Sequence, residues 1–582
     1  MSLLDPLLAK AVLVRGRLQY ASLMRAVSRA ARVQERALSE KLARTADSAF
    51  GQEHHFERIH SYRDYVSRVP VQTYEEVRPY IQRVMAGEIT ALFGRRQPVL
   101  MFATTSGTVD QPKYVPVTAE CLTECRRGWS ILGAKALLDH PAAFRRGILQ
   151  VASPLDETRT ELGVPCGSIS GLLAATQKRV VQRYYVTPRA VAAIADPDAR
   201  YYCIMRLALP RDVAWMVTAS PATQLRLART GADQAEALIR DIHDGALRPP
   251  GDLPHDVQQA LAAPLSPDRQ TALRLRELWD RHGELLPKHY WQLSFLANWT
   301  GGTMGLHLRD FPRYFGETPV RDIGLVATEG RVSIPMADGT PAGVLDISSS
   351  FFEFVEAGAD ASNPSAVHRC HELSPGCEYR LLMTTSGGLF RYDLGDYVRV
   401  HEYLGQAPMI EFLHRGAFVS SMTGEKLTEW QVTKAFEQAS RALGVRVAAF
   451  VLAPCWGNPP FYRLHTDAPV SDPTRLTADL DAELSRMNIE YRSKRTTRRL
   501  GPIDFNLLPT GALGRLEADR LRRQGASSEQ YKHQYLYSRP GEDGWLPQAG
   551  VSPEIQVTAA QVSFGFDSRR ALRSTCDAPD ER

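Results

Sequence analysis

Small hydroxyl residues, a glycine and a lysine come together in the segment TTSGTVDQPK at 104–113. The residues just before it, PVLMFA at 98–103, form a short apolar run that is typical of a buried strand. A strand that ends in such a loop offers backbone N–H and side-chain O–H groups to phosphate oxygens, and a nearby lysine adds a positive charge. The residues expected to face phosphate are Thr105, Ser106, Gly107, Thr108 and Lys113. The sequence GxxxxGK[ST] is absent, so this is not a Walker A loop, and from the loop alone an ordinary turn remains an alternative.

Two acidic residues lie beside other short apolar runs. Glu329 follows IGLVA at 323–327, and Asp396 opens DYVRV at 396–400. A carboxylate can hold a hard cation such as Mg²⁺ against phosphate oxygens, or accept two hydrogen bonds from a ribose diol. Taken singly, each also has a plain structural interpretation: Glu329 as the cap of a turn, and Asp396 as part of an Asp-Gly hairpin turn.

The order of these residues resembles the acyl-adenylate-forming superfamily, which includes luciferase, acyl-CoA ligases and amino-acid adenylation domains. T-S-G-T-x-x-x-P-K at 105–113 resembles its phosphate loop, although Val109 and Asp110 replace the usual Thr-Gly. VATEG at 326–330 resembles its second motif and GLFRYDLGDYVR at 388–399 its third. The resemblance implies ATP and Mg²⁺ as cofactors.

The same resemblance implies a role for each matching residue. Thr328 would touch the α-phosphate, Glu329 would hold Mg²⁺, and Asp396 rather than its neighbour Asp393 would bind the ribose. Arg415, in EFLHRG, matches an arginine that contacts the ribose just before the hinge, and Lys532, in QYK, matches a late lysine that swings toward the α-phosphate. We therefore expect Lys532, Glu329 and Lys113 to be catalytic.

Further motifs narrow the resemblance to one branch. FFEF at 351–354, APMIEFLHR at 407–415, GEKLTE at 424–429 and G-A-S-x-x-Q-Y-K at 525–532 are similar to the Gretchen Hagen family of acyl-acid amido synthetases. The resemblance extends from residue 104 to 532, but His533-Gln534-Tyr535 replaces the end of the family's Q-Y-K-x-P-R. It implies that a small-molecule carboxylic acid becomes an acyl-AMP with release of pyrophosphate, and that an amine, such as an amino acid, then takes the acyl group and releases AMP.

Two other functions remain open from the sequence. An acyl-CoA synthetase would share the adenylation step and use a thiol acceptor. A catalytically inactive nucleotide-binding scaffold would keep the fold, which the changes at Val109 and Asp110 favour mildly and the intact charged residues disfavour.

The surrounding pattern predicts an α/β fold with β-sheets flanked by helices. Helical spacing dominates residues 1 to about 95, and further helices are predicted at 222–245, 256–281, 430–442 and 474–490. Other predicted strands lie at 147–152, 323–327, 379–384, 396–400, 446–453, 461–466 and 503–508. The pattern of predicted helices and strands changes near residue 415. We therefore expect a large N-terminal adenylation domain at 1–415 and a small mobile α/β domain at 416–582, with a hinge at 414–424 between them. The acid is expected near 160–175 and 294–330, where ANWTGGTMGLH at 297–307 is rich in small residues.

Composition limits the classes of protein and of binding partner that fit this chain. The chain has 582 residues, of which 44% are hydrophobic and 23% charged, as in ordinary globular proteins. A net charge of +5 is too diffuse for a nucleic-acid partner, and no apolar run is long enough for a membrane span. Eight scattered cysteines and the absence of a signal-peptide pattern fit a cytoplasmic protein. HRCHELSPGC at 368–377 has no common zinc-site spacing, so we expect a loop there.

Overall fold

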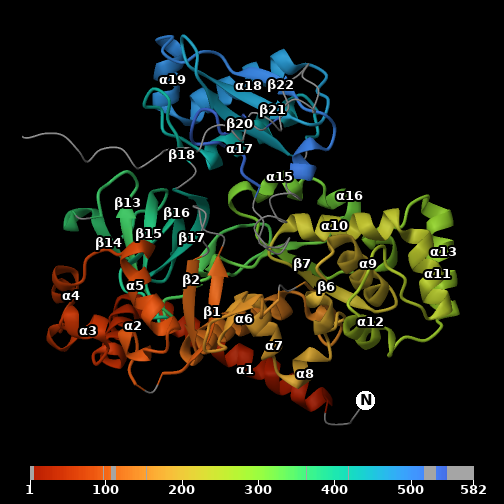
Figure 1. Ribbon diagram of the computed structural model, residues 1–582, viewed down its shortest axis with the longest axis horizontal. Helices are drawn as coiled ribbons and strands as arrows, with labels where there is room; N and C mark the ends of the chain where they lie inside the picture. Colours follow the sequence, from red (N-terminus) through yellow and green to blue (C-terminus); the bar gives the residue numbers. More distant parts are fainter. Residues whose placement is uncertain are drawn as a thin grey trace, which may run out of the picture.

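The computed structural model describes most of the chain as a mixed α/β protein, as expected. The described residues are 5–95, 97–105, 113–151, 154–361, 363–416, 419–447, 449–516, 533–544 and 546. Several sheets flanked by helices make up the larger part, and a smaller α/β unit, blue in Figure 1, lies above it. None of the helices in these ranges is long and apolar enough to cross a membrane.

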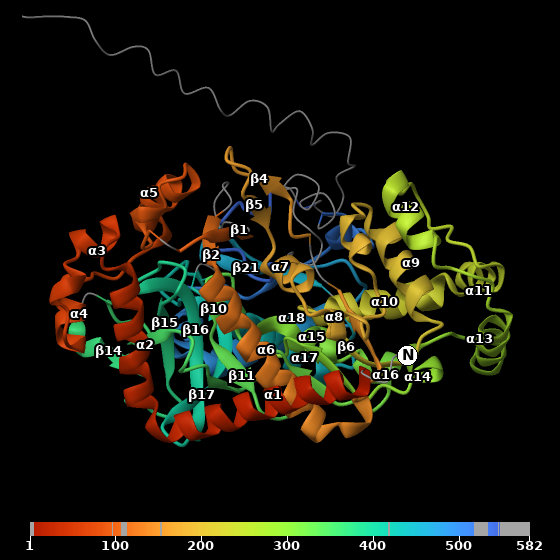
Figure 2. The same ribbon diagram turned by 90° about the horizontal axis from the view of Figure 1, so that it is seen from below.

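The N-terminal region is helical, as predicted. Its helices are α1 (Asp5–Ala26), α2 (Ala30–Thr45), α3 (Ala49–Glu53), α4 (Tyr62–Arg68) and α5 (Tyr74–Met85). α1 lies alongside α6 (Ala119–Asp139), as Figure 2 shows, and Gly16 permits this approach because a Cβ there would come within 2.8 Å of Ala134. These helices frame the sheets that carry the candidate site.

The predicted strand at 98–103 is present as β1 (Val99–Thr105). It pairs antiparallel with β2 (Lys113–Thr118), and Thr105 lies opposite Lys113 in the register. The two strands belong to a four-stranded sheet of order β2-β1-β5-β4, with β4 at Thr158–Arg159 and β5 at Pro165–Gly167. α6 follows β2 directly, and the side chain of Thr118 caps it by accepting a hydrogen bond from the Cys121 backbone N–H.

A second sheet is parallel, with order β3-β6-β7-β8. Its strands are β3 (Gly147–Gln150), β6 (Val213–Val217), β7 (Phe295–Asn298) and β8 (Val320–Asp322). Its helices include α9 (Pro197–Ala208), α10 (Pro221–Asp233), α11 (Ala235–Asp244), α12 (His255–Ala262) and α13 (Arg269–His282), with a hydrophobic core of their own. The helical stretches predicted at 222–245 and 256–281 are thus each divided into two helices. The first breaks at Gln234, and Pro264 and Pro267 separate α12 from α13.

The largest sheet has seven strands in the order β11-β12-β17-β16-β15-β13-β14, all antiparallel. The strands are β11 (Ser333–Pro335), β12 (Gly343–Leu345), β13 (Phe351–Glu356), β14 (Val367–Arg369), β15 (Glu378–Thr384), β16 (Tyr392–Leu404) and β17 (Ala407–Arg415). The strand predictions at 379–384 and 396–400 are confirmed, the second as part of the longer β16. In the HRCHELSPGC segment, His368 belongs to β14 and its Nε2 lies 2.8 Å from the Glu356 carboxylate.

The C-terminal unit folds around its own core. It contains β18 (Val419–Ser420), β19 (Leu427–Thr428), α17 (Glu429–Ala442), β20 (Phe450–Cys455), β21 (Phe461–Thr466), α18 (Pro473–Met487), α19 (Ile489–Thr496) and β22 (Asp504–Leu507). β20, β21 and β22 form one sheet, and helices α17 and α18 pack against each other. The helix at 430–442 and the strands at 461–466 and 503–508 are confirmed. The strand predicted at 446–453 begins only at Phe450, and the helix predicted at 474–490 ends at Met487, after which Asn488 caps α19.

Candidate functional site

Lys113 is held at the loop end of the β1–β2 hairpin. Its register partner is Thr105, so the loop at 106–112 starts and ends at neighbouring points. Lys113 Nζ lies 5.3 Å from the centroid of the Tyr74 ring, a cation–π contact from α5. The Tyr74 hydroxyl oxygen accepts a 2.7 Å hydrogen bond from the Tyr114 backbone N–H. α5 thus fixes the start of β2 and with it the position of the ammonium group.

Thr328 and Glu329 form the two-residue turn of a small hairpin. β9 (Val326–Ala327) and β10 (Gly330–Arg331) pair antiparallel on either side of them. The strand predicted at 323–327 begins only at Val326, because Gly324 has a positive φ of 85° and lies in the break between β8 and β9. Glu329 therefore lies at a turn rather than at the end of a continuous strand.

Asp396 and Arg415 face each other across β16 and β17. They are register partners, and Arg415 Nε donates a 2.8 Å hydrogen bond to Asp396 Oδ1. Asp396 is 3% exposed, and its negative charge raises the pKa of the Arg415 guanidinium. The bond uses one oxygen of Asp396, which leaves Oδ2 available to a diol.

A bulge places Asp396 at this point. Between β15 and β16 the register steps from Leu382–Asp393 to Arg380–Tyr397, so β16 has two extra residues. Gly395 sits in the bulge with a φ of 68°, a conformation that favours glycine. The sequence suggested an Asp-Gly hairpin turn as the alternative here, and the structure shows a bulge inside a continuous strand instead.

The predicted charged residues converge on Glu329. The charges that act on its carboxyl are those of Arg415, Asp396 and Lys113, which come from three other segments of the chain. Glu329 is only partly accessible to solvent and is enclosed by protein atoms, and this burial raises the pKa of its carboxyl. The site thus combines two cations with two carboxylates, a set that can bind the polyphosphate, the metal and the ribose of a nucleotide.

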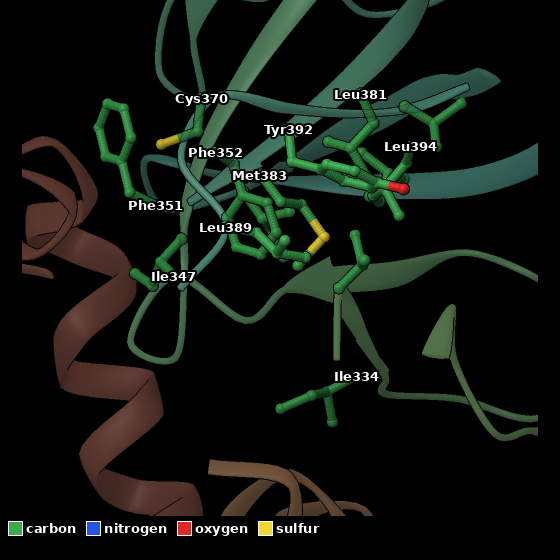
Figure 3. Close-up of a cluster of buried hydrophobic side chains, with 14 of the residues drawn as sticks. Ile334, Ile347, Phe351, Phe352, Cys370, Leu381, Met383, Leu389, Tyr392 and Leu394 are labelled. Carbon is green, nitrogen blue, oxygen red and sulfur yellow. The ribbon is translucent and has the colours of Figure 1, made fainter. Parts of the chain in front are cut away.

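The site rests on the main hydrophobic core. Figure 3 shows part of this core, with Phe352, Met383, Leu389 and Tyr392 among its labelled side chains. A Cβ on Gly330 would lie 3.2 Å from Met383 Cε, so the Thr328–Glu329 turn is seated directly on this cluster. A rigid base of this kind keeps charged side chains in a fixed relative position.

Some predicted site residues lie outside the described part of the chain. Ser106, Gly107, Thr108 and Lys532 belong to this group, and of Thr105 only the backbone is described. The residue after Lys532 is fixed, because His533 Nε2 lies 2.9 Å from the Phe450 carbonyl oxygen and the backbone N–H of Leu452 donates to the Tyr535 carbonyl. The segment after Lys532 is thus anchored beside β20.

The residues present fit a divalent cation held jointly with phosphate. Within the described residues, the Glu329 carboxylate has no cationic partner within 4.0 Å, although burial disfavours its charge. Among the same residues there is also no group of three or more His, Cys, Asp or Glu that could hold an ion alone. Mg²⁺ commonly uses one or two carboxylates together with phosphates and water, which is the set that Glu329 could complete.

The small residues at 297–307 serve packing. Gly301 and Gly302 lie against the backbone of β17, where a Cβ would meet the Phe412 or Leu413 carbonyl oxygen at 3.2 Å. A hollow beside the site is lined by Ile169 and by the Thr328–Gly330 turn, both within the segments named for the acid, and also by α6. Sequence reasoning missed the α6 wall as well as Tyr74, because neither carries a local motif.

Comparison with known proteins gives three consecutive family matches. The GH3 family N-terminal domain matches residues 19–320, the GH3 family central domain 343–415, and the GH3 family C-terminal domain 430–540. Together they cover most of the chain.

Individual relatives match over similar lengths. An indole-3-acetic acid-amido synthetase, GH3.8 of Oryza sativa subsp. indica, is 26% identical over 86% of this chain and 87% of its own. A jasmonoyl–L-amino acid synthetase, GH3.5 of Oryza sativa subsp. japonica, is 23% identical over 86% of this chain and 91% of its own. The solved structure of GH3.15 acyl acid amido synthetase has a TM-score of 0.77 at 21% identity and covers 89% of this chain and 94% of its own, which shows a shared fold.

Proposed function

The chain belongs to the GH3 family, and on that premise we propose that it is an ATP-dependent acyl-acid amido synthetase. It activates a carboxylic acid as an acyl-adenylate and transfers the acyl group to an amine, for which an amino acid is the best candidate. The observation that carries the proposal is the convergence of Lys113, Asp396 and Arg415 around Glu329. Relatives over most of the chain's length are named amido synthetases, which supports the same reaction class.

Each residue of the site has a distinct task in this proposal. Thr105, Ser106, Gly107 and Thr108 are assigned to phosphate oxygens of ATP, and Thr328 to the α-phosphate. Lys113 supplies positive charge from the hairpin end, while Asp396 and Arg415 bind the ribose. When bound, Mg²⁺ would neutralise phosphate charge, and Glu329 is the residue that would hold it.

The reaction has two steps. In the first, a carboxylate oxygen attacks the α-phosphorus of ATP, the bond to the β-phosphate oxygen breaks, and pyrophosphate leaves. In the second, an amine attacks the acyl carbon, loses a proton, and AMP leaves as the C–O bond breaks. Lys532 stabilises the crowded negative charge at the α-phosphate in the first step.

We propose that the two steps use two arrangements of two domains, 1–415 and 416–582. The separate hydrophobic core of the C-terminal unit supports this division. A rotation about the hinge at 414–424 would bring Lys532 to the site for adenylation and remove it for transfer. The scattered cysteines favour the cytoplasm as its location.

Product analysis tests the proposal. The purified chain is incubated with Mg·ATP, a panel of aryl and short-chain acids, and either mixed amino acids or coenzyme A, and the products are identified by mass spectrometry. Formation of AMP, pyrophosphate and an acyl–amino acid amide supports the proposal. A thioester that forms with coenzyme A and no amide would identify an acyl-CoA synthetase instead. ATP binding without pyrophosphate release from any acid would favour an inactive scaffold.

A further inference from the structure

Helix α17 of the C-terminal unit makes contacts on two opposite faces. One face packs into the core of its own unit through apolar side chains, namely Val432, Ala435, Phe436 and Ala439. The other face, at the same helical spacing, turns toward the larger part of the chain with Trp430, Lys434, Glu437 and Ser440. Figure 1 shows α17 and α15 (Gly305–Leu308) on either side of the boundary between the two parts. The second face of α17 is therefore a contact between them.

Arg309 contacts α17 near its C-terminal end. Its Nη1 donates a 3.0 Å hydrogen bond to the Ser440 hydroxyl, and its Nη2 donates a 3.5 Å hydrogen bond to the Val445 carbonyl oxygen just after the helix. Within the described ranges, both hydrogen bonds of the Arg309 side chain thus go to the C-terminal unit. Because the donor is charged, such bonds are stronger than those between neutral groups.

Arg399 contacts α17 at its N-terminal end. Arg399 Nη2 donates a 2.6 Å hydrogen bond to the carboxylate of Glu378, its register partner on β15, and this bond orients the guanidinium. The guanidinium carbon lies 4.8 Å from the centroid of the Trp430 ring, which is a cation–π contact. The larger part of the chain therefore holds α17 at both ends.

Between these two ends, a glycine lets the helix come close. A Cβ on Gly305 would lie 3.2 Å from Glu437 Oε2 and 3.5 Å from Lys434 Nζ. The next residue, Leu306, packs against the core of the C-terminal unit. The segment also rests on the sheet of the candidate site, because Gly302 lies against the backbone of β17, the strand that carries Arg415. We call residues 302–309 the α17 seat.

Several groups in this contact are charged and can be hydrated when it opens. Arg309, Arg399, Lys434 and Glu437 would each regain water if α17 left the seat. Interfaces between domains that move are typically more polar than permanent ones. The apolar face of α17 would stay buried in its own unit during such a movement. The C-terminal unit can therefore leave the seat without unfolding.

We propose that the α17 seat and Arg399 form a latch that holds the C-terminal unit in the observed arrangement, with Arg309 and Arg399 as its positioning residues. This inference rests on the proposed function for the existence of a second arrangement. It adds the contact that sets the ratio of the two arrangements, since α17 must leave the seat before the unit can rotate.

Energy transfer between two dyes measures this ratio in the full-length, nucleotide-free protein. The dyes are attached at Leu273→Cys on α13 and Trp456→Cys between β20 and β21, both at exposed positions, with Cys377 and Cys576 replaced by serine. Single-molecule transfer histograms give the fraction of molecules in each arrangement. We expect the observed arrangement to dominate in the protein with an intact latch.

Three variants weaken the latch in different ways. Arg309→Met removes both hydrogen bonds and should shift the ratio away from the observed arrangement by roughly 10-fold. Trp430→Leu removes the ring under Arg399 and should shift it by about 3-fold or more. Gly305→Leu keeps those contacting groups and places a side chain where Glu437 and Lys434 lie, so it should shift the ratio in the same direction.

Arg313→Met is the matched control for Arg309→Met. Arg313 lies four positions further on and forms a 3.1 Å ion pair with Glu284 inside the larger part of the chain. This variant loses an exposed arginine without changing the latch, so the ratio should stay within about 2-fold of its original value.

The two half-reactions separate a shifted ratio from a damaged fold. Exchange of pyrophosphate into ATP, dependent on the acid, measures the first step, and aminolysis of a chemically prepared acyl-adenylate measures the second. Arg309→Met should slow one of them at least about 3-fold relative to the other, because each step uses one arrangement. Equal losses in both steps would contradict the latch.

Two further results would overturn the inference. The first is an unchanged ratio in all three latch variants, and the second is a shift in Arg313→Met as large as that in Arg309→Met. The test also keeps the two proposals apart. A ratio that responds to the latch variants, in a protein that shows no pyrophosphate exchange, contradicts only the proposed function. Exchange in the wild-type protein, with an unchanged ratio in the latch variants, contradicts only this inference.

Discussion

At the scale of single residues, the site is an arrangement of opposed charges around one enclosed carboxylate. Glu329 has cations from two other segments as neighbours and a second carboxylate, Asp396, nearby. Arg415 is committed to Asp396 by a 2.8 Å hydrogen bond. In our proposal, Glu329 is therefore the carboxylate that holds the metal, and Asp396 is the one that binds the ribose diol.

Replacement of each carboxyl group by an amide tests whether Asp396 or Asp393 binds the ribose. Asp396→Asn should raise the KM for ATP by a factor of roughly 10 to 100, because the ribose loses a charged acceptor and Arg415 loses its partner. Asp393→Asn is the matched control. Asp393 Oδ1 accepts the Gly395 backbone N–H at 2.8 Å, a bond that an asparagine oxygen can keep, and the variant loses only the 3.5 Å ion pair between Asp393 Oδ2 and Arg380 Nε. A larger change in KM for Asp393→Asn would show that the ribose assignment is reversed.

The raised pKa of Glu329 predicts a pH effect. Because burial raises this pKa, the carboxyl keeps its proton to a higher pH than an ordinary glutamate, so Mg·ATP should bind more weakly as pH falls through that range. In the absence of nucleotide, a rise in pH has the opposite effect on the free energy of unfolding. The folded state loses stability as pH rises from the usual glutamate pKa to the raised pKa of Glu329. Glu329→Gln should therefore raise Tm at pH 8 and lower kcat roughly 100-fold or more.

Titration of activity and thermal unfolding against pH checks both effects. Lys113→Gln serves as the comparison, since it removes charge from the same site without removing the carboxyl. If Glu329→Gln keeps the acidic limb of the wild-type profile, another group is responsible for it.

The site residues that could be predicted from the sequence are those that lie in short, distinctive motifs. Lys113, Glu329, Asp396 and Arg415 each sit in a short stretch whose order is distinctive, so each could be named in advance. Tyr74 could not, because it acts through the backbone of Tyr114, 40 positions along the chain.

At the scale of elements, hairpins and a bulge position the chemistry. The β1–β2 hairpin carries Lys113, the β9–β10 hairpin carries Glu329, and a bulge in β16 sets Asp396. The sequence predicted most strands near their observed positions, since short apolar runs are distinctive. It missed the break at Gln234, where helical spacing continues through 222–245. At 323–327 it predicted a strand over the whole apolar run, although only Val326 and Ala327 form one, as β9.

The loop after the proposed hinge depends on one buried carboxylate. Glu425 is 1% exposed and accepts hydrogen bonds from the Met422 N–H at 2.6 Å, the Thr423 N–H at 2.8 Å and the Tyr462 hydroxyl at 2.6 Å. Burial alone would raise the pKa of Glu425, but these hydrogen bonds outweigh it and lower the pKa below its usual value. Glu425 therefore stabilises the fold above the usual glutamate pKa, and this contribution is lost as pH falls through the lowered pKa.

Glu425→Gln should lower the free energy of unfolding by about 2 kcal/mol at neutral pH, because charge-assisted hydrogen bonds are weakened. The difference should shrink below about pH 4, where the wild-type carboxyl begins to gain a proton. Urea denaturation at both pH values measures it. The control is Glu437→Gln, which removes surface pairs to Lys434 and Arg441 on α17 and should cost less than about 0.5 kcal/mol. Equal costs for the two variants would contradict the role of Glu425.

At the scale of the whole molecule, the two parts of the chain meet through apolar and polar contacts, and Leu306 of the larger part packs against the core of the C-terminal unit. Arg309 follows α15 (Gly305–Leu308) and donates hydrogen bonds to the Ser440 hydroxyl at 3.0 Å and the Val445 carbonyl at 3.5 Å. His307 lies beside this contact, and burial lowers its pKa to about 4, so it is uncharged at neutral pH.

Energy transfer between two dyes tests the proposed rotation. Leu273→Cys and Trp456→Cys give labelling sites on the two parts, at positions that are 63% and 76% exposed, with Cys377 and Cys576 replaced by serine. We expect the transfer efficiency to change between the ATP-bound protein and the protein bound to a stable acyl-adenylate analogue with an amine. An efficiency that is the same in every state would contradict the two-arrangement mechanism.

The central claim is that this site activates a carboxylate on the α-phosphorus of ATP, and an oxygen-transfer measurement tests it most directly. The full chain is incubated with Mg·ATP, an amine and an acid carrying ¹⁸O in its carboxyl group, and the nucleotide and phosphate products are analysed by mass spectrometry. Our account predicts one ¹⁸O atom in AMP, none in pyrophosphate, and loss of the transfer in Glu329→Gln. Label in inorganic phosphate with ADP as the other product, or amide formation with unlabelled AMP, would contradict it.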